Sequence, residues 1–365
     1  MTNFSAIDHE HMAHALRLAE LGLFTTQPNP RVGCVIAHGA DVVGEGWHQR
    51  AGEPHAEVFA LREAGTRARG ATAYVTLEPC AHHGRTPPCA DALVAAGVSR
   101  VVIAAEDPFP QVAGRGIAIL RAAGITVETG LMREAARELN VGFFSRIERG
   151  RPWLRVKLAM SLDGRTALAN GESKWITGEL ARADVQRWRA RSSAILTGSG
   201  TALADNPQLT VRLPDEEAYK PPLRVVLDRQ LRTPADSYLL DGSVPTLLLH
   251  SAAIDRPASG GLVEYAPVPE RDDLFDLGAV LALLAQRGCN EVHVEAGPVL
   301  CGALFAAGLV DELLLYVAPL LLGDAARPLM HLPALTDMAS RWSLQTIDRL
   351  VLGDDIRIRL RPADS

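Results

Sequence analysis

Short runs of β-branched residues alternate with Ala- and Leu-rich segments along most of the chain. In the first part, the expected strands are Val32–Ile36, Tyr74–Leu77, Val101–Ala105 and Ile125–Glu128. The expected helices are Asp8–Gly22, Ala56–Ala64, Asp91–Ala96, Gly116–Ala123 and Arg133–Leu139. Repeated alternation of strands and helices predicts a layered α/β domain.

A second series of the same kind follows a change in composition around Ser145–Pro152, where a run of charges and a Gly-Arg-Pro step precede a new strand at Trp153–Met160. A chain of 365 residues exceeds the usual size of one domain, so we expect two, covering residues 1–150 and 151–365. The other expected strands are Ala194–Thr197, Arg224–Leu227, Thr246–His250, Val292–Glu295, Leu313–Val317 and Asp355–Leu360, with helices at Gly178–Ala190, Leu277–Arg287 and Val299–Ala307.

Charge, hydropathy and cysteine content exclude several classes of protein. The formal net charge is −6 and no Lys/Arg block is present, whereas duplex nucleic acid requires a basic face. The longest strongly apolar run, Leu313–Leu322, falls far short of the roughly 20 residues of a membrane helix, so we expect a buried strand there. The first residues, Met1–Leu21, lack a signal-peptide pattern. Five scattered cysteines fit a reducing compartment, so we expect a cytoplasmic protein.

His55, Glu57, Cys80 and Cys89 form the strongest chemical motif in the sequence. One imidazole and two thiolates make a set of three ligands that leaves a fourth position for water, as a catalytic zinc requires. A His-x-Glu motif followed by Pro-Cys-x-x-Cys is typical of zinc-dependent deaminases, in which the Glu carries protons and is not a ligand. Eight residues separate the cysteines here, which is a longer spacing. We predict that His55, Cys80 and Cys89 hold zinc and that Glu57 is catalytic.

Both halves of this site are expected at helix starts, with the second helix beginning at Asp91. A helix N-terminus lowers the pKa of a thiol and so favours the thiolates that bind metal. The alternative is a structural zinc site in which His82 or His83 supplies a fourth ligand, or two buried cysteines beside an incidental histidine. The remaining cysteines are expected to be small buried side chains, and three N-terminal histidines are expected on a solvated helix face: Cys34, Cys289, Cys301, His9, His11 and His14.

The His-Ala-Glu motif, the loop His-His-Gly-Arg-Thr-Pro-Pro between the cysteines and the upstream segment Pro28–Gly33 closely resemble the bifunctional riboflavin biosynthesis deaminase-reductase family. The resemblance covers nearly the whole chain. It implies a cytidine-deaminase-like three-layer α/β/α domain followed by a dihydrofolate-reductase-like α/β domain, one zinc ion per chain, and NADP(H). It also implies that Asn29 binds the pyrimidine, although a simple turn residue before Pro30 is the alternative.

The resemblance implies two successive reactions. The first is hydrolytic deamination of 2,5-diamino-6-(5-phosphoribosylamino)pyrimidin-4(3H)-one. The second is NADPH-dependent reduction of 5-amino-6-(5-phosphoribosylamino)uracil to the ribitylamino product.

Several segments of the second half resemble the reductase domain of this family in the same order. They are Lys157–Gly164, Ser173–Thr177 with Thr177 as the expected helix N-cap, Thr197–Thr201, Asp205–Arg212 and Glu295–Ala303. By similarity, the NADP-binding residues are Ala159, Trp175, Thr201, Asp205, Gly297, Pro298, Val299, Leu300, Cys301, Gly302 and Ala303. By similarity, the substrate-binding residues are Lys157, Ser173, Arg189, Leu209, Arg212 and Glu295. Asp205 could belong to either group.

Individually, these residues have ordinary alternatives. Trp175 could be a core indole instead of flanking a ring, and Arg189 or Arg212 could be a solvated charge instead of a phosphate ligand. Arg229 departs from the family, which often has a small polar residue there. An arginine at this position would contact the 2′-phosphate of NADPH or face water, and the preference for NADPH over NADH stays open.

Two other functions compete with this interpretation. One is a deaminase whose C-terminal domain only binds a ligand and has lost the reduction. The presence of Lys157, Asp205 and Glu295 argues against this loss. The other is a nucleic-acid-binding or editing protein, which the acidic balance disfavours. The expected partner is a small phosphoribosylated pyrimidine, and the family suggests a homodimer or larger homo-oligomer that assembles through reductase domains.

Overall fold

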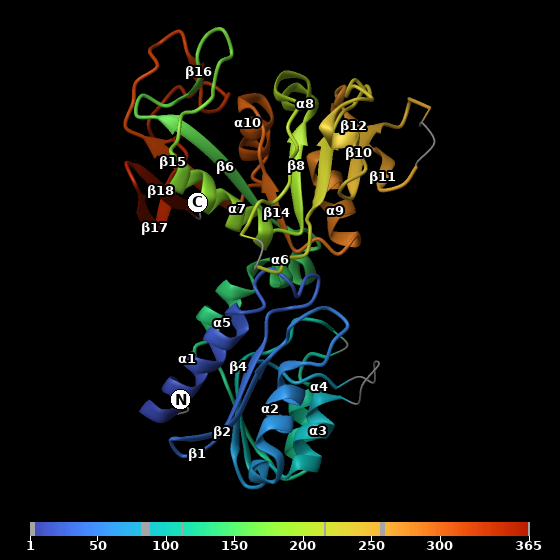
Figure 1. Cartoon of the computed structure of the whole chain (residues 1–365), viewed down its shortest axis with the longest axis vertical. Coiled ribbons are helices and arrows are strands. Elements are labelled where there is room, and N and C mark those ends of the chain that lie inside the picture. Colours follow the sequence, from blue (N-terminus) through green and yellow to red (C-terminus); the bar gives the residue numbers. More distant parts are fainter. Residues whose placement is uncertain (1–3, 82–87, 111, 215–216, 256–259, 364–365) are drawn as a thin grey trace. The chain divides into compact units, whose positions relative to one another are not determined.

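The computed structural model of the chain describes residues 4–81, 88–110, 112–214, 217–255 and 260–363. The chain divides into two compact units, Met1–Gly150 and Arg151–Ser365, and each is described by itself (Figure 1). Within the described residues, no helix has both the length and the apolar character needed to cross a membrane.

The first unit contains a five-stranded sheet with the order β2-β1-β3-β4-β5. Strand β1 is antiparallel to β2 and to β3, whereas β3, β4 and β5 are parallel. The strands are β1 (Gly33–His38), β2 (Asp41–Trp47), β3 (Thr72–Leu77), β4 (Arg100–Ala105) and β5 (Thr126–Thr129). The helices are α1 (Ala6–Glu20), α2 (Ala56–Ala64), α3 (Cys89–Ala96), α4 (Arg115–Ala122), α5 (Arg133–Leu139) and α6 (Val141–Arg149), with a short 3-10 turn at Gly65–Ala68.

Helices cover both faces of this sheet. Apolar side chains of α2, α3 and α4, such as Ala60 and Leu93, are buried with those of one sheet face. Side chains of α1, α5 and α6, such as Met12 and Phe144, are buried with those of the other face. The predicted three-layer α/β/α arrangement is therefore confirmed, and it places the N-termini of α2 and α3 in the same layer.

The second unit contains a nine-stranded sheet with the order β11-β10-β9-β8-β14-β6-β15-β18-β17. The strands from β11 to β15 are parallel, and β18 and β17 extend the sheet by antiparallel pairing. These strands are β6 (Trp153–Ser161), β8 (Ala194–Gly198), β9 (Leu223–Leu227), β10 (Thr246–Ser251), β11 (Val263–Val268), β14 (Glu291–Val294), β15 (Glu312–Ala318), β17 (Leu344–Leu352) and β18 (Asp355–Pro362). Shorter pieces are β7 (Arg165–Ala167), β12 (Glu270–Arg271), β13 (Leu274–Phe275), β16 (Arg327–Pro328) and a 3-10 turn at Tyr238–Leu240.

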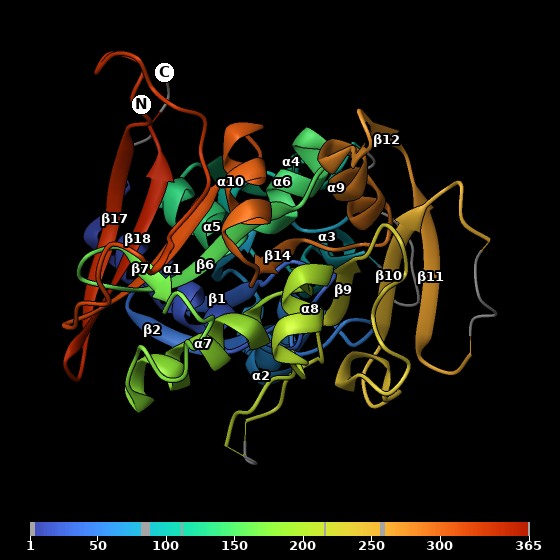
Figure 2. The ribbon, with the colours of Figure 1, turned by 90° about the horizontal axis from the view of Figure 1, so that it is seen from above.

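Helices also cover both faces of the larger sheet, as Figure 2 shows. Helices α9 (Leu277–Gln286) and α10 (Pro298–Ala306) bury Leu281 and Leu304 against one face. On the other face, α7 (Glu179–Arg191) packs beside β15 and α8 (Ser199–Asp205) packs beside β8 and β9. The mixed α/β fold predicted for this half is confirmed, and the expected buried strand in Leu313–Leu322 is confirmed as β15.

Some predicted boundaries are wrong. The helix expected from Asp91 begins at Cys89, and the N-cap of α7 is Gly178 instead of Thr177. The expected elements also leave out β2, α6, α8, β11 and β17, together with the short strands β7, β12, β13 and β16. These differences matter for the first site, because the earlier start of α3 makes Cys89 its first residue.

Candidate functional site

The predicted zinc-binding side chains converge in the first unit. His55 is the N-cap of α2, Cys89 is the first residue of α3, and Cys80 lies in the connection that follows β3. The His55 Nδ1 atom lies 3.6 Å from Cys80 Sγ and 3.3 Å from Cys89 Sγ. All three ligand atoms lie within 4.8 Å of one another. Tetrahedral zinc at ordinary bond lengths separates such atoms by roughly 3.3–3.8 Å, so the set fits one zinc ion.

No fourth ligand joins this set in the part of the chain that the structure describes. His82 and His83, the alternative fourth ligands, lie outside the described residues. Among the described residues the donors are one imidazole and two sulfurs, which is the set of protein ligands that a catalytic zinc site can use.

The two thiols differ in acidity. The pKa of Cys80 is lowered to about 4 because Cys89 and His55 hydrogen-bond to its sulfur. The pKa of Cys89 is raised, because it shares a hydrogen bond with Cys80 and is buried. Without metal, one proton shared between the two sulfurs therefore lies on Cys89, and Cys80 is the thiolate.

Glu57 lies in the first turn of α2 and is buried. Burial raises the pKa of its carboxyl group above the ordinary value, while His55 opposes this shift. Its Oε2 atom has no hydrogen-bond partner among the described residues. A buried carboxyl group with a free oxygen beside a metal-ligand set is suited to receive and deliver a proton.

A cavity of about 310 Å³ opens onto these groups. Asn29 and His48 line it, and the Nδ2 atom of Asn29 lies 3.1 Å from His48 Nε2. His48 Nδ1 lies 3.1 Å from the carbonyl oxygen of Pro54, and burial lowers the pKa of His48. A neutral His48 donates from Nδ1 to the Pro54 carbonyl oxygen, so its Nε2 atom can accept a hydrogen bond from the Asn29 Nδ2 group. This hydrogen bond fixes the orientation of the Asn29 amide.

His48 and Glu78 are site residues that the sequence does not reveal. Neither has a ligand-like spacing to the zinc motif. Glu78 accepts backbone N–H groups of four residues that precede or begin α4, and it holds the neighbouring loop in place: Asp107, Gly114, Gly116 and Ile117. Gly116 is required here, because a Cβ atom would lie 2.0 Å from the carbonyl oxygen of Pro79, next to Cys80.

The other histidines and cysteines that the structure describes take no part in this set. His9 is exposed and His14 contacts Glu45, but His11 is buried and contacts the Gly39 carbonyl, so the expected solvated face is wrong for His11. Three cysteines are buried, as expected: Cys34, Cys289 and Cys301.

The second unit has a larger cavity, of about 530 Å³. Twelve of the residues predicted for its cofactor and substrate line this cavity: Lys157, Ala159, Ser173, Trp175, Arg189, Thr201, Asp205, Leu209, Arg212, Glu295, Gly297 and Pro298. The remaining predicted residues, Val299–Ala303, lie within α10 and do not line it. Cys301 and Gly302 are buried, and a Cβ atom on Gly302 would lie 2.0 Å from the His331 carbonyl oxygen.

Arg189 and Glu295 form an ion pair in this cavity. The guanidinium of Arg189 donates from Nε and Nη2 to the two Glu295 carboxylate oxygens at 2.5 and 2.8 Å. Burial would raise the pKa of Glu295, but Arg189 and His293 hold it well below its ordinary value. Burial also lowers the pKa of the nearby Lys157 ammonium.

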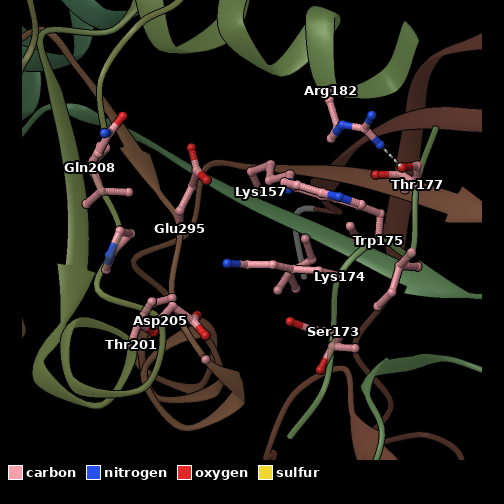
Figure 3. A pocket seen from close by; sticks show the side chains of 18 of the residues that line it. Lys157, Ser173, Lys174, Trp175, Thr177, Arg182, Thr201, Asp205, Gln208 and Glu295 are labelled. Carbon is pink, nitrogen blue, oxygen red and sulfur yellow. Dashed lines mark hydrogen bonds between the residues drawn. The ribbon is translucent and has the colours of Figure 1, made fainter. Parts of the chain in front are cut away.

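Trp175 is 67% exposed and lines the cavity, so the alternative of a core indole is wrong. The Arg182 guanidinium lies 4.6 Å from its ring centroid and donates to the Thr177 carbonyl oxygen, as Figure 3 shows. Arg229 does not line the cavity; its guanidinium lies 3.8 Å from Glu270 and 3.6 Å from Asp273. Arg229 is therefore engaged by carboxylates.

Two family models match this chain, one within each unit. Residues 5–105 match the model described as the cytidine and deoxycytidylate deaminase zinc-binding region. Residues 152–353 match the RibD C-terminal domain, which is more than half of the chain.

Relatives cover both units. The chain is 50% identical to riboflavin biosynthesis protein RibD of Escherichia coli, with 97% of this chain and 99% of that protein covered. It is 43% identical to RibD of Bacillus amyloliquefaciens, with 98% and 97% covered.

Solved structures agree over the same length. RibD of Acinetobacter baumannii has a TM-score of 0.90 at 46% identity, with 98% and 99% covered. A Thermotoga maritima protein, described as a diaminohydroxyphosphoribosylaminopyrimidine deaminase and 5-amino-6-(5-phosphoribosylamino)uracil reductase, has a TM-score of 0.86 at 32% identity, with 98% and 99% covered. The chain belongs to the RibD family of bifunctional riboflavin biosynthesis enzymes, which join a zinc-binding deaminase domain to an NADPH-using reductase domain.

Proposed function

We propose that residues 1–150 deaminate 2,5-diamino-6-(5-phosphoribosylamino)pyrimidin-4(3H)-one and that residues 151–365 reduce the resulting 5-amino-6-(5-phosphoribosylamino)uracil to the ribitylamino product. The description of the Thermotoga maritima structure supports this choice of substrates. The observation that carries the proposal is the convergence of His55, Cys80 and Cys89 beside the buried carboxyl group of Glu57.

In the first site, His55, Cys80 and Cys89 would hold one zinc ion, which activates water for hydrolysis when it is bound. Glu57 takes a proton from the attacking water and delivers it to the departing amine. Its raised pKa suits this exchange, because the carboxyl group must be able to hold a proton during the reaction. Its unpartnered Oε2 atom supports the same role.

Asn29 orients the pyrimidine in this site. Its Nδ2 atom is engaged by His48, so the amide oxygen remains to accept a hydrogen bond from a ring substituent. His48 acts through Asn29 and is therefore a positioning residue. This pairing supports the role predicted for Asn29 over that of a simple turn residue.

In the second site, NADPH supplies the hydride when it is bound, and the chain supplies position and charge. Trp175 offers an exposed aromatic face, and α10 begins at the cavity with Gly297 as its N-cap and Pro298 as its first residue. The free N–H groups of this first turn would suit a phosphate of NADPH. Lys157, whose pKa burial lowers, is suited to give a proton to the reduced substrate. The Arg189–Glu295 pair presents an ordered polar wall to the substrate.

The test follows both products with the full chain. Without NADPH, the pyrimidine substrate should release one ammonia per molecule, and NADPH should be consumed only once deaminated substrate is present. NADPH consumption before ammonia release, or ammonia release without later NADPH consumption, would contradict the proposed sequence. The second result would restore the alternative of a C-terminal domain that only binds.

We also propose a cytoplasmic enzyme that forms a homo-oligomer through its reductase domains. All five cysteines are free, as a reducing compartment permits. Leu344, Val351 and Ile356 are exposed large apolar residues on the edge strand β17 and its neighbour β18, and they support an interface there. Light scattering of the purified chain would measure the assembly, and a monomer at micromolar concentration would contradict it.

A further inference from the structure

The cavity of the second unit concentrates positive charge in an acidic protein. The chain has a formal net charge of −6, yet six basic and only two acidic residues line this cavity. The basic residues are Lys157, Lys174, Arg182, Arg189, Arg212 and Arg327. Such an excess of positive charge in a concave site attracts anionic ligands.

Some of these cations already have partners. Arg189 pairs with Glu295, and Arg182 donates to the Thr177 carbonyl oxygen and stacks on Trp175. The guanidinium groups of Arg182 and Arg189 are therefore held by other residues of the cavity wall.

Lys174 differs from these two arginines. Its side chain is exposed, and among the described residues no hydrogen bond, ion pair or ring contact links it to another group. Figure 3 shows that it extends into the cavity from the segment that carries Ser173 and Trp175. A cation that the fold does not use therefore points into the space where the ligands would bind.

The choice of lysine is also unusual for this chain. Of its 37 basic residues, only Lys157, Lys174 and Lys220 are lysines, and two of these three line this cavity. Arginine forms many of the ion pairs of the fold, as in Arg155–Glu312, and His293 lies 3.3 Å from Glu295. Lysine carries a compact ammonium on a flexible stem, which suits a point contact to a phosphate that arrives with a ligand.

We propose that the Lys174 ammonium binds a phosphate group of a ligand in the reductase cavity. The inference rests on the proposed reductase function, in which NADPH and the phosphoribosyl substrate both bring phosphate. Arg229 is not available for this purpose, because Glu270 and Asp273 lie beside its guanidinium. Lys174 is thus an addition to the residues that resemblance assigned to this cavity.

The test compares Lys174→Met, which keeps the length of the side chain and removes its charge, with Lys174→Arg. The control is Lys220→Met, which removes an exposed lysine that does not line the cavity. Dissociation constants of the full chain are measured by fluorescence for NADPH, NADH, the deaminated substrate and its dephosphorylated form. Lys174→Met should weaken at least one phosphate-bearing ligand by about 10-fold, Lys174→Arg should recover most of this loss, and Lys220→Met should match the wild type.

The pattern identifies the phosphate. An equal loss for NADPH and NADH places Lys174 at the pyrophosphate, and a loss for NADPH alone places it at the 2′-phosphate. A loss for the phosphorylated substrate, but not for its dephosphorylated form, places it at the substrate phosphate. Unchanged constants for all four ligands would overturn the inference. A wild-type chain that binds neither cofactor would instead overturn the proposed reductase function.

Discussion

The two cavities assemble their functional groups in different ways. The first takes its metal ligands and Glu57 from one stretch of chain, His55–Cys89, in which two helix starts and one loop meet. The second takes its lining from residues spread between Lys157 and Leu329, on strands, loops and helix starts of a nine-stranded sheet.

This difference explains why the residue types of the sequence are enough to predict the first site but not the second. The first site needs unusual ligands at close quarters, and their chemistry restricts the possible functions to very few. The second site uses common residues such as Ser173, Leu209 and Arg212, whose meaning depends on the folded sheet that brings them together. The first site is therefore recognised by its metal ligands, and the second only by the arrangement of strands that brings its residues together.

The largest effect should come from removing one metal ligand. Cys89→Ser replaces a thiolate with a poor zinc ligand, so bound zinc should be lost and ammonia release should fall at least about 100-fold. Reduction of deaminated substrate should stay within about twofold, because its residues lie in the other unit. Metal analysis and the two separate assays measure this. Cys289→Ser, which also changes a buried cysteine, should keep its zinc. A parallel loss of both activities in Cys89→Ser would show that the two sites are not independent.

A smaller effect should come from the corresponding change in the second unit. Glu295→Gln leaves the Arg189 guanidinium without its carboxylate partner, so NADPH oxidation should fall about 10-fold or more and the second unit should lose about 2 kcal/mol of stability. Steady-state reduction and urea unfolding measure these two changes. Ammonia release and zinc content should not change, and a decrease in either would show that the two sites depend on each other.

The smallest effect should come from a residue that only orients the substrate. Asn29→Ala removes one hydrogen bond to the pyrimidine, so kcat/KM of deamination should fall by about 5- to 10-fold, or about 1 kcal/mol, with zinc content unchanged. Asn170→Ala, at an exposed turn, is the matched control and should behave as the wild type. An Asn29→Ala variant with the kcat/KM of the wild type would show that Asn29 is only a turn residue and does not orient the substrate.

Strands and helices could be predicted where their apolar residues recur in a clear pattern. They could not be predicted where glycines, or side chains that are mostly exposed, remove that pattern. Strand β2 contains Gly44 and Gly46. A Cβ atom would lie 2.3 Å from the Ala60 carbonyl oxygen at Gly44, and 2.6 Å from the Phe59 Cβ atom at Gly46. These glycines allow α2 to pack closely, but they weaken the strand signal. Strand β17 is mostly exposed, so its residues do not alternate between apolar and polar.

Buried ion pairs could not be predicted either. Arg155 is fully buried and pairs with Glu291 on β14 and Glu312 on β15, the two strands that flank β6. More than 130 residues of sequence separate Arg155 from each partner, as the hydrogen bonds show. The same limit applies to His48, whose role depends on its contact with Asn29 and not on a motif.

Glu57 should carry protons beside a three-ligand zinc site without binding the metal itself. The most direct measurement is the zinc content and ammonia release of Glu57→Gln, which preserves the shape of the side chain and removes its titratable group. We expect about one zinc per chain in both the wild type and the variant, and a loss of deamination of at least about 100-fold in the variant alone. A variant that releases ammonia at the wild-type rate, or one that loses its zinc, would contradict it.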